Sequence, residues 1–119
     1  MIEGIGTDIV KIQRINDRVI DRILSDDEKK IFNNFKNENR KKEFAAGRFS
    51  AKEALYKALN TSFDFNKVSI LNKKNGEPYI DENSMNYITK KIDKIKIKVT
   101  ISHEKEYAIA FVVVEREVE

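Results

Sequence analysis

The chain has 119 residues, a net charge of +3 and 36% charged residues, with no cysteine and one histidine. This length predicts one domain, residues 1–119, with a modest core. The absence of cysteine excludes a disulfide framework and a cysteine nucleophile, and a single histidine excludes a multi-histidine metal site. Neither a membrane span nor a signal segment is visible, so we expect a cytoplasmic protein without a membrane partner.

Residues 2–9 are predicted to form a strand that contains two glycines, Gly4 and Gly6, and one carboxylate, Asp8. Glycine inside a strand often marks the close approach of another backbone or a ligand. Asp8 is followed directly by two branched apolar residues, and an ionised carboxylate there needs a cation or several N–H donors. Asp8 could equally cap the next helix, and the local sequence does not decide between the two.

Residues 11–24 have a helical period with an apolar stripe of isoleucine and valine. A second stripe carries four basic residues at spacings of three and four: Lys11, Arg14, Arg18 and Arg22. Such a stripe is usually a solvated helix face, here partly neutralised by aspartates. It could instead dock an acidic partner helix or a nucleic-acid backbone.

Ser25 and Glu28 have the spacing of a capping box, which predicts a short helix that ends near Phe35. Residues 36–42 are polar and predict a connection into a long helix, residues 43–59. Beyond that helix, Asn60 is the expected C-terminal stop.

Small residues on one face of the long helix predict close packing against another element, such as the glycine-containing strand. The opposite face gathers charged side chains at helical spacing: Arg48, Lys52, Glu53 and Lys57. This face could be solvated, with Glu53 and Lys57 as an i,i+4 pair. Alternatively, if the strand packs beside the helix, Asp8 and Glu53 could share Mg²⁺ while the basic residues bind phosphates.

The second half of the chain changes to a strand period. Residues 68–73 alternate, and the Asn75-Gly76 pair predicts a hairpin turn before a returning strand that starts at Pro78. Residues 81–93 favour a short helix and an irregular segment equally.

Residues 95–102 alternate as a half-buried strand, and residues 107–114 are apolar enough to predict a strand that is buried on both faces. Between them lies His103, which by itself is more often a surface residue at a strand end than a catalytic one. Together the elements predict an α+β fold.

Four segments together resemble the holo-[acyl-carrier-protein] synthases, which are the small phosphopantetheinyl transferases. They are GIGTDIVKIQRI, FAAGRFSAKEALYKAL, NGEPYI and VTISHEKEYAIAFVVVE, in that order along the chain. The match covers essentially the whole chain, and GRF-x-AKEA-x-x-KA with an upstream GIGTD is specific. The resemblance implies the 4′-phosphopantetheinyl transferase fold, in which an antiparallel sheet packs against a long central helix.

The resemblance also implies an activity that supports fatty acid biosynthesis. The 4′-phosphopantetheine group of coenzyme A is transferred to a serine of apo acyl carrier protein, and adenosine 3′,5′-bisphosphate is released. By motif, Asp8 and Glu53 are the Mg²⁺ ligands and Lys57 lies beside the reacting pyrophosphate, which makes these three the expected catalytic residues.

Further roles are implied for basic residues. Arg48 and His103 are expected near the nucleotide and its phosphates, and Lys52 is grouped with them because it matches the motif. The arginines expected to dock the acidic helix of the carrier protein are Arg14, Arg18 and Arg22. Family members are homotrimers with active sites at subunit interfaces, so we expect a homotrimer.

One segment departs from the family pattern. Where the family has a glycine-rich turn after the long helix, this chain has LNTSFD at residues 59–64. Glycines there would let backbone N–H groups approach the nucleotide phosphates, so this departure concerns the contact with coenzyme A. Asn60 can still adopt a left-handed conformation.

Two other functions are compatible with parts of the sequence. A basic nucleic-acid-binding domain would use the arginine stripe, but the sequence lacks an aromatic-interleaved basic surface. An inactive assembly subunit would not need Asp8, Glu53 and Lys57. We therefore expect acyl carrier protein and coenzyme A as partners and no nucleic acid.

Overall fold

The computed structural model describes residues 1–117, so the last two residues of the predicted domain lie outside the described part. In chain order the helices and strands are β1 (Ile2–Lys11), α1 (Asp17–Ile23), α2 (Asp26–Asn34), α3 (Glu38–Leu59), β2 (Ile70–Asn72), β3 (Pro78–Ile80), α4 (Glu82–Thr89), β4 (Ile95–His103) and β5 (Tyr107–Arg116). Two single-turn 3-10 helices are added, η1 (Ile12–Arg14) and η2 (Phe65–Lys67). The predicted α+β fold is confirmed.

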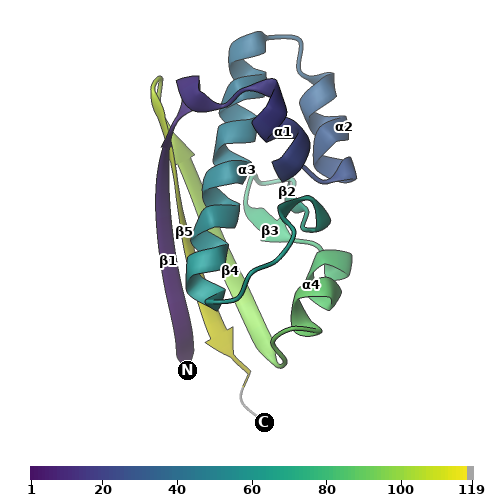
Figure 1. Cartoon of the computed structure of the whole chain (residues 1–119), viewed down its shortest axis with the longest axis vertical. Coiled ribbons are helices and arrows are strands. Elements are labelled where there is room, and N and C mark those ends of the chain that lie inside the picture. The colour runs from purple at the N-terminus through teal and green to yellow at the C-terminus, as the bar shows by residue number, and fades with distance from the viewer. Residues whose placement is uncertain (118–119) are drawn as a thin grey trace.

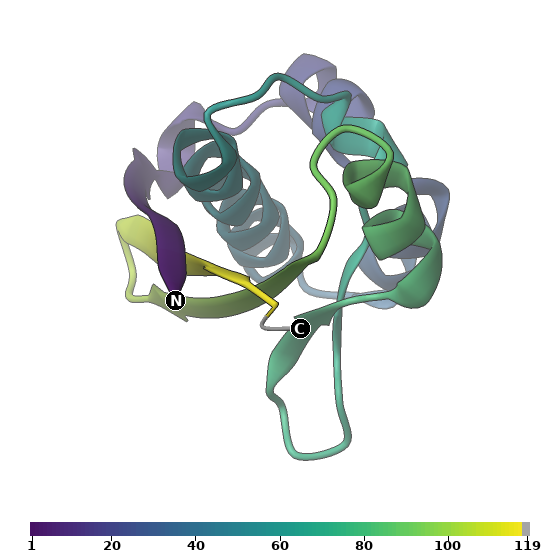
Figure 2. The ribbon, with the colours of Figure 1, turned by 90° about the horizontal axis from the view of Figure 1, so that it is seen from below.

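Three strands form the main sheet in the order β1-β5-β4, and both pairings are antiparallel. The helix α3 runs along one face of this sheet, α1 and α2 lie on the side of α3 away from β1, and α4 lies next to the β2–β3 hairpin (Figure 1). The β2–β3 hairpin forms a second, two-stranded sheet that projects from the body of the molecule (Figure 2). The predicted packing of an antiparallel sheet against a long central helix is therefore present.

Two glycines let β1 lie directly on the backbone of α3. A Cβ atom at Gly4 would lie 2.0 Å from the carbonyl oxygen of Ala58, and one at Gly6 would lie 2.0 Å from that of Ala54. Side chains cannot occupy this space, which is why the strand carries glycine and the helix carries alanine where they meet. The predicted packing of the small-residue face against the glycine-containing strand is confirmed.

The core consists of two clusters of buried side chains, and α3 contributes to both. One cluster lies between α3 and the sheet and includes Ala54, Leu55, Val68, Ile88 and Val112. The other lies under α1 and α2 and includes Ile12, Ile15, Ile23, Leu24 and Phe44. Because α3 is packed on both sides, its rotation about its own axis is fixed, and so is the direction of every side chain that it carries.

The prediction of one helix over residues 11–24 is wrong. β1 continues to Lys11, η1 makes a single turn, and Asn16 is extended before α1 begins. The Asn16 side chain accepts a hydrogen bond from the backbone N–H of Val19 and so starts a new helix. The basic stripe is therefore divided among a strand end, η1 and α1: Lys11, Arg14, Arg18 and Arg22.

The long helix begins at Glu38 rather than at residue 43, so most of the predicted polar connection is helical. The Asn37 side chain caps it by accepting from the backbone N–H groups of Asn39 and Arg40. The predicted end is confirmed, because Asn60 has the left-handed conformation, with φ 54°.

The structure confirms the predicted capping box and hairpin turn, and it decides the conformation of the segment after β3. Ser25 and Glu28 form the capping box of α2, and the β2–β3 turn contains Gly76 at φ 92°. The undecided segment after β3 forms α4, because the Asp81 side chain accepts from the N–H of Ser84 and caps a helix there. No helix within residues 1–117 is long and apolar enough to span a bilayer.

The strand β5 is buried on one face only, which contradicts the prediction of burial on both. Its inner residues, such as Ala110 and Val112, pack under α3, but Ile109 and Phe111 are 43% and 41% exposed. On the paired strand β1, Ile5 and Ile9 are 60% and 61% exposed on the same side. We call Ile5, Ile9, Ile109 and Phe111 the outer apolar face; such a patch usually marks an interaction site.

The contact between β1 and α3 predicts a large effect of one methyl group. Gly6→Ala should lower the free energy of unfolding by more than about 4 kcal/mol, because the new Cβ meets a backbone carbonyl that cannot move aside alone. Urea unfolding followed by circular dichroism measures this.

The matched control is Gly47→Ala in α3, where the Cβ would lie 3.1 Å from the Ile101 Cγ2 atom of a side chain that can adjust. There the helix propensity gain of about 1 kcal/mol offsets the tight contact. Equal destabilisation by the two substitutions would contradict the interpretation. Removing the Ala54 side chain should not rescue Gly6→Ala, because the clash is with the backbone.

Candidate active site

Asp8 of β1 and Glu53 of α3 line one cavity of about 510 Å³. The contact of β1 with α3 at the two glycines brings these residues together, although they are distant in sequence. We call this the carboxylate cavity; its walls also include Lys11, Arg14, Phe49 and Tyr107. The structure therefore provides the proximity on which the prediction of a shared cation depended.

One oxygen of the Asp8 carboxylate has a partner and the other does not. Oδ1 lies 3.5 Å from Nζ of Lys57, which also donates to the backbone carbonyl of Thr7 at 2.9 Å. Oδ2 is buried, and within residues 1–117 it has no hydrogen-bond partner. A buried carboxylate oxygen without a donor is costly, so this atom is suited to a cation. The alternative that Asp8 caps a helix is wrong, because Asn16 caps α1.

Glu53 is partly buried beside the Asp8 carboxylate. Burial raises the pKa of Glu53, the negative charge of Asp8 raises it further, and the ammonium of Lys57 opposes both. The carboxylate cavity thus holds two like charges that Lys57 only partly offsets. This arrangement favours a bound cation, whose charge would attract both carboxylates.

Arg48 and His103 line a different cavity, of about 300 Å³, at the β4 edge of the sheet. We call this the arginine cavity; its walls also include Arg40, Glu43, Asn72 and Gly76. His103 is half-exposed, with Nδ1 3.8 Å from a carboxylate oxygen of Glu43. Since β1 and β4 are opposite edges of the sheet, one chain does not bring the two cavities together.

Arg48 is held firmly in the wall of the arginine cavity. Its guanidinium lies 4.2 Å from the ring centroid of Phe44 and donates to the Ile70 carbonyl and to the Asn72 side chain, at 2.9 and 2.5 Å. Burial lowers the pKa of Arg48 to about 10, partly offset by the charge of Glu28. Arg48 therefore remains cationic at neutral pH and can attract an anionic group into this cavity.

The structure contradicts the prediction that Lys52 binds the cofactor, because its side chain is 0% exposed. Its ammonium donates to Glu28 at 2.5 Å and to the backbone carbonyls of Ile23 and Phe65 at 2.6 and 2.9 Å. Burial lowers the pKa of Lys52, and the attraction of Glu28 opposes that shift. The helical period correctly placed Lys52 on the charged face, but α2 and the loop after α3 cover that part of the face.

The three arginines predicted to dock a partner separate in the structure. Arg14, on η1, lines the carboxylate cavity, whereas Arg18 and Arg22 are exposed on α1. The break at Asn16 changes the direction of the chain between them. Only Arg14 is therefore placed beside Asp8 and Glu53.

Reasoning from sequence missed several residues. Glu28 was predicted only as a helix cap, and Asn72 only as part of a strand, yet they contact Lys52 and Arg48. Tyr107 and Phe49 were not connected with Asp8 at all. No local pattern marks these residues, because each acquires its role from an element distant in the sequence.

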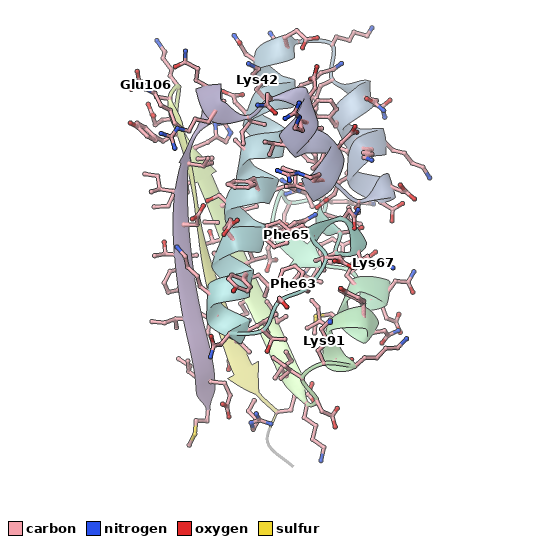
Figure 3. All side chains as sticks on the ribbon, viewed as in Figure 1. Lys42, Phe63, Phe65, Lys67, Lys91 and Glu106 are labelled. Atoms are coloured by element: carbon pink, nitrogen blue, oxygen red, sulfur yellow. The ribbon has the colours of Figure 1, made fainter. Side chains whose placement is uncertain are left out.

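The loop after α3 is held without the glycines that the family pattern would supply. Asn60 turns the chain, and the rings of Phe63 and Phe65 lie 5.1 Å apart beside the end of α3 (Figure 3). The backbone N–H of Asp64 donates to the hydroxyl of Tyr87 at 2.9 Å. Aromatic packing thus takes the place of a flexible turn, and at least this N–H has an internal partner.

Comparison with known proteins gives consistent matches. The sequence model of the 4′-phosphopantetheinyl transferase superfamily matches residues 4–112. A holo-[acyl-carrier-protein] synthase of Petrotoga mobilis is 47% identical over 115 residues, which cover 96% of this chain and 97% of the relative.

Two solved structures extend the match to three dimensions. A holo-(acyl-carrier-protein) synthase from Bacillus anthracis in complex with CoA (3′,5′-ADP) has a TM-score of 0.83 at 35% identity, covering 98% of this chain and 99% of that one. A holo-[acyl-carrier-protein] synthase from Helicobacter pylori in complex with coenzyme A has a TM-score of 0.72 at 31% identity, covering 93% and 99%.

The repulsion between Asp8 and Glu53 predicts that neutralising Glu53 stabilises the protein when no divalent cation is present. Glu53→Gln should raise the free energy of unfolding in a chelating buffer at neutral pH, because a raised carboxylate pKa means that the charged form is disfavoured on folding. The gain should stay below about 1 kcal/mol, since water screens a partly exposed group. Thermal unfolding with EDTA measures it.

The control is Glu77→Gln, which removes the exposed carboxylate 3.5 Å from Lys73 and should leave Tm unchanged or slightly lower. If Glu53→Gln lowers Tm as well, the two carboxylates do not repel one another as the geometry implies.

Proposed function

The chain belongs to the 4′-phosphopantetheinyl transferase superfamily, and from this premise we propose how its residues carry out the reaction of a holo-[acyl-carrier-protein] synthase. The enzyme transfers 4′-phosphopantetheine from coenzyme A to a serine of apo acyl carrier protein and releases adenosine 3′,5′-bisphosphate. The observation that carries the proposal is the pairing of Asp8 and Glu53 on one cavity. We also propose a role in fatty acid biosynthesis and a cytoplasmic location, in keeping with the absence of cysteine.

Asp8 and Glu53 are proposed to hold Mg²⁺. The unpartnered Oδ2 atom of Asp8 and the repulsion felt by Glu53 fit a cation between them. Among residues 1–117 no group of three or more His, Cys, Asp or Glu side chains could hold a metal ion. Two carboxylates suit Mg²⁺, which takes its remaining ligands from water and substrate phosphates. When bound, Mg²⁺ would offset the negative charge that develops on the pyrophosphate.

Lys57 is proposed to add positive charge at the same centre. Its ammonium is anchored on the Thr7 carbonyl and beside Asp8, while half of its side chain is exposed to the solvent. The ammonium can therefore contact a pyrophosphate oxygen while it keeps its contacts with Thr7 and Asp8 of β1. The serine oxygen of the carrier attacks the β-phosphorus and its proton passes to water. The bond from the β-phosphorus to the bridging oxygen breaks, and that oxygen leaves as part of adenosine 3′,5′-bisphosphate.

The arginine cavity is proposed to bind the nucleotide end of coenzyme A. Arg48 supplies a buried cation that is fixed in place, and His103 and Arg40 supply more exposed polar groups. The guanidinium is fixed by its bonds to Ile70 and Asn72, so its positive charge would attract a phosphate group at a set position.

We propose a homotrimer as the arrangement that joins the two cavities. The carboxylate cavity lies at the β1 edge and the arginine cavity at the β4 edge of the same sheet. A ring that sets the β1 edge of one subunit against the β4 edge of the next brings together cavities from different chains. The outer apolar face, uncovered in one chain, supports such an assembly because it would be buried in it.

Acyl carrier protein is proposed to dock on the arginines near the carboxylate cavity. Arg14 lines this cavity, so an acidic carrier helix bound there would lie beside the reacting centre. Arg18 and Arg22 extend the basic surface along α1. The same surface would then bring the carrier's serine to Asp8 and Glu53.

The direct test is incubation with apo acyl carrier protein, coenzyme A and MgCl₂, followed by mass spectrometry of the carrier. The carrier should gain one phosphopantetheine group, EDTA should prevent the gain, and Glu53→Gln should lower kcat/KM by about 100-fold or more. MgCl₂ alone should raise Tm of the wild type and leave Glu53→Gln nearly unchanged. No gain in mass for the wild type refutes the activity, and full activity of Glu53→Gln refutes only the metal assignment.

Subunit complementation tests the shared site. Glu53→Gln damages the carboxylate cavity and His103→Glu places a negative charge in the arginine cavity, so each variant alone should be nearly inactive. After the two are unfolded, mixed equally and refolded, about a quarter of the sites should combine an intact cavity from each variant. Each variant refolded alone is the control. Activity that stays at the sum of the two separate variants would show that both cavities do not serve one reaction.

A further inference from the structure

A buried ion pair lies outside both cavities and takes no part in the proposed chemistry. Glu28 of α2 and Lys52 of α3 are both 0% exposed, and the Lys52 Nζ atom lies 2.5 Å from Oε1 of Glu28. Burying two charges carries a desolvation penalty, and well-packed apolar side chains often serve stability equally well. The pair therefore calls for an explanation beyond stability.

Both oxygens of Glu28 are occupied, and they serve different elements. Oε1 accepts from the ammonium of Lys52 and from the backbone N–H of Ser25 at 2.9 Å. Oε2 accepts from the backbone N–H of Ile70 at 2.8 Å. The carboxylate thus joins the start of α2, the middle of α3 and the first residue of β2 at one point.

The Ile70 contact continues to the arginine cavity. The carbonyl of Ile70 accepts from Nε of Arg48, and Nη2 of Arg48 donates to the side-chain oxygen of Asn72. The amide of Asn72 in turn donates to the carbonyl of Gly76 at 2.9 Å. Arg48, Asn72 and Gly76 all line the arginine cavity. An unbroken series of hydrogen bonds therefore runs from Lys52 and Glu28 to the cavity wall.

We propose that Glu28 is a positioning residue for the nucleotide end of coenzyme A. Its carboxylate, held in place by Lys52, fixes Ile70 and hence β2, and β2 sets the direction of the Arg48 guanidinium and the β2–β3 hairpin. Glu28 is fully buried and touches no substrate. This inference rests on the proposed function, because it assigns the arginine cavity to the nucleotide.

A positioning role of Glu28 can be distinguished from a role in stability, because Glu28 contacts the arginine cavity through hydrogen bonds but does not contact the carboxylate cavity in this way. Asp8, Glu53 and Arg14 are held by β1, α3 and η1, and Glu28 makes no hydrogen bond to them. Loss of the Glu28 carboxylate should therefore affect the handling of coenzyme A and spare the handling of acyl carrier protein. A role in stability alone would change both together or neither.

The test is Glu28→Gln. An amide offers one oxygen and one NH₂ group, and Lys52 and Ser25 require the oxygen, so the NH₂ group meets the N–H of Ile70 as donor against donor. KM for coenzyme A and the Kd for adenosine 3′,5′-bisphosphate, measured by calorimetry, should rise about tenfold. KM for acyl carrier protein and kcat should change by less than about threefold.

Two further variants keep the test decisive. If Glu28→Gln does not fold, the double substitution Glu28→Leu with Lys52→Met replaces the pair by apolar side chains and still removes the acceptor for Ile70. The control is Lys29→Met, on the same helix. It removes only an exposed ion pair, in which Nζ of Lys29 lies 3.9 Å from Asp21, and should leave both KM values unchanged.

The results separate the inference from the proposed function. Absence of transfer by the wild type refutes the proposed function itself. An active wild type whose Glu28 variants keep the same KM for coenzyme A, or raise both KM values equally, refutes positioning by Glu28. A selective rise in KM for coenzyme A, matched by weaker binding of adenosine 3′,5′-bisphosphate, supports it.

Discussion

The backbone contact between β1 and α3 determines the rest of the structure. Gly4 and Gly6 let the strand approach until a Cβ atom would lie 2.0 Å from helix carbonyl oxygens. At that distance the next inward residue of the strand, Asp8, reaches the side of the helix that carries Glu53. Any larger side chain at the glycines would separate the two carboxylates. The same contact thus provides close packing and places two negative charges together, which is unfavourable without a cation.

The charged face of α3 serves three purposes at different points around the helix. Glu53 and Lys57 face β1, Lys52 points into the interior, and Arg48 reaches the β4 edge. Packing on both sides prevents the helix from rotating, so these directions are fixed. Only Glu53 and Lys57 form the kind of charged site on one helix face that the helical period predicts. Arg48 and Lys52 are instead fixed by internal hydrogen bonds.

The outer apolar face and the separation of the two cavities at opposite sheet edges both favour association of several chains. In one chain Ile5 and Ile9 are largely exposed to solvent, and the carboxylate cavity and the arginine cavity lie at different edges of the sheet. An assembly that covers this face would bury its apolar side chains and could also bring together cavities from different chains. Burial of apolar surface drives such association. In the proposed homotrimer each chain would supply part of a larger site, with the carboxylate cavity at one sheet edge and the arginine cavity at the other.

The sequence by itself determined the α+β class, and it predicted the cap at Ser25 and the stop at Asn60 because these depend on local backbone preferences. It also predicted the close packing of the glycine-containing strand on the alanines of α3, because small side chains on both elements permit a close approach. It also singled out Asp8 and Glu53, through residue type and motif. Only the tertiary structure decided that Lys52 is buried against Glu28, that Asn16 divides the basic stripe and that β5 is covered on one face. Periodicity reports which face of an element a residue occupies. What covers that face is decided by elements distant along the chain.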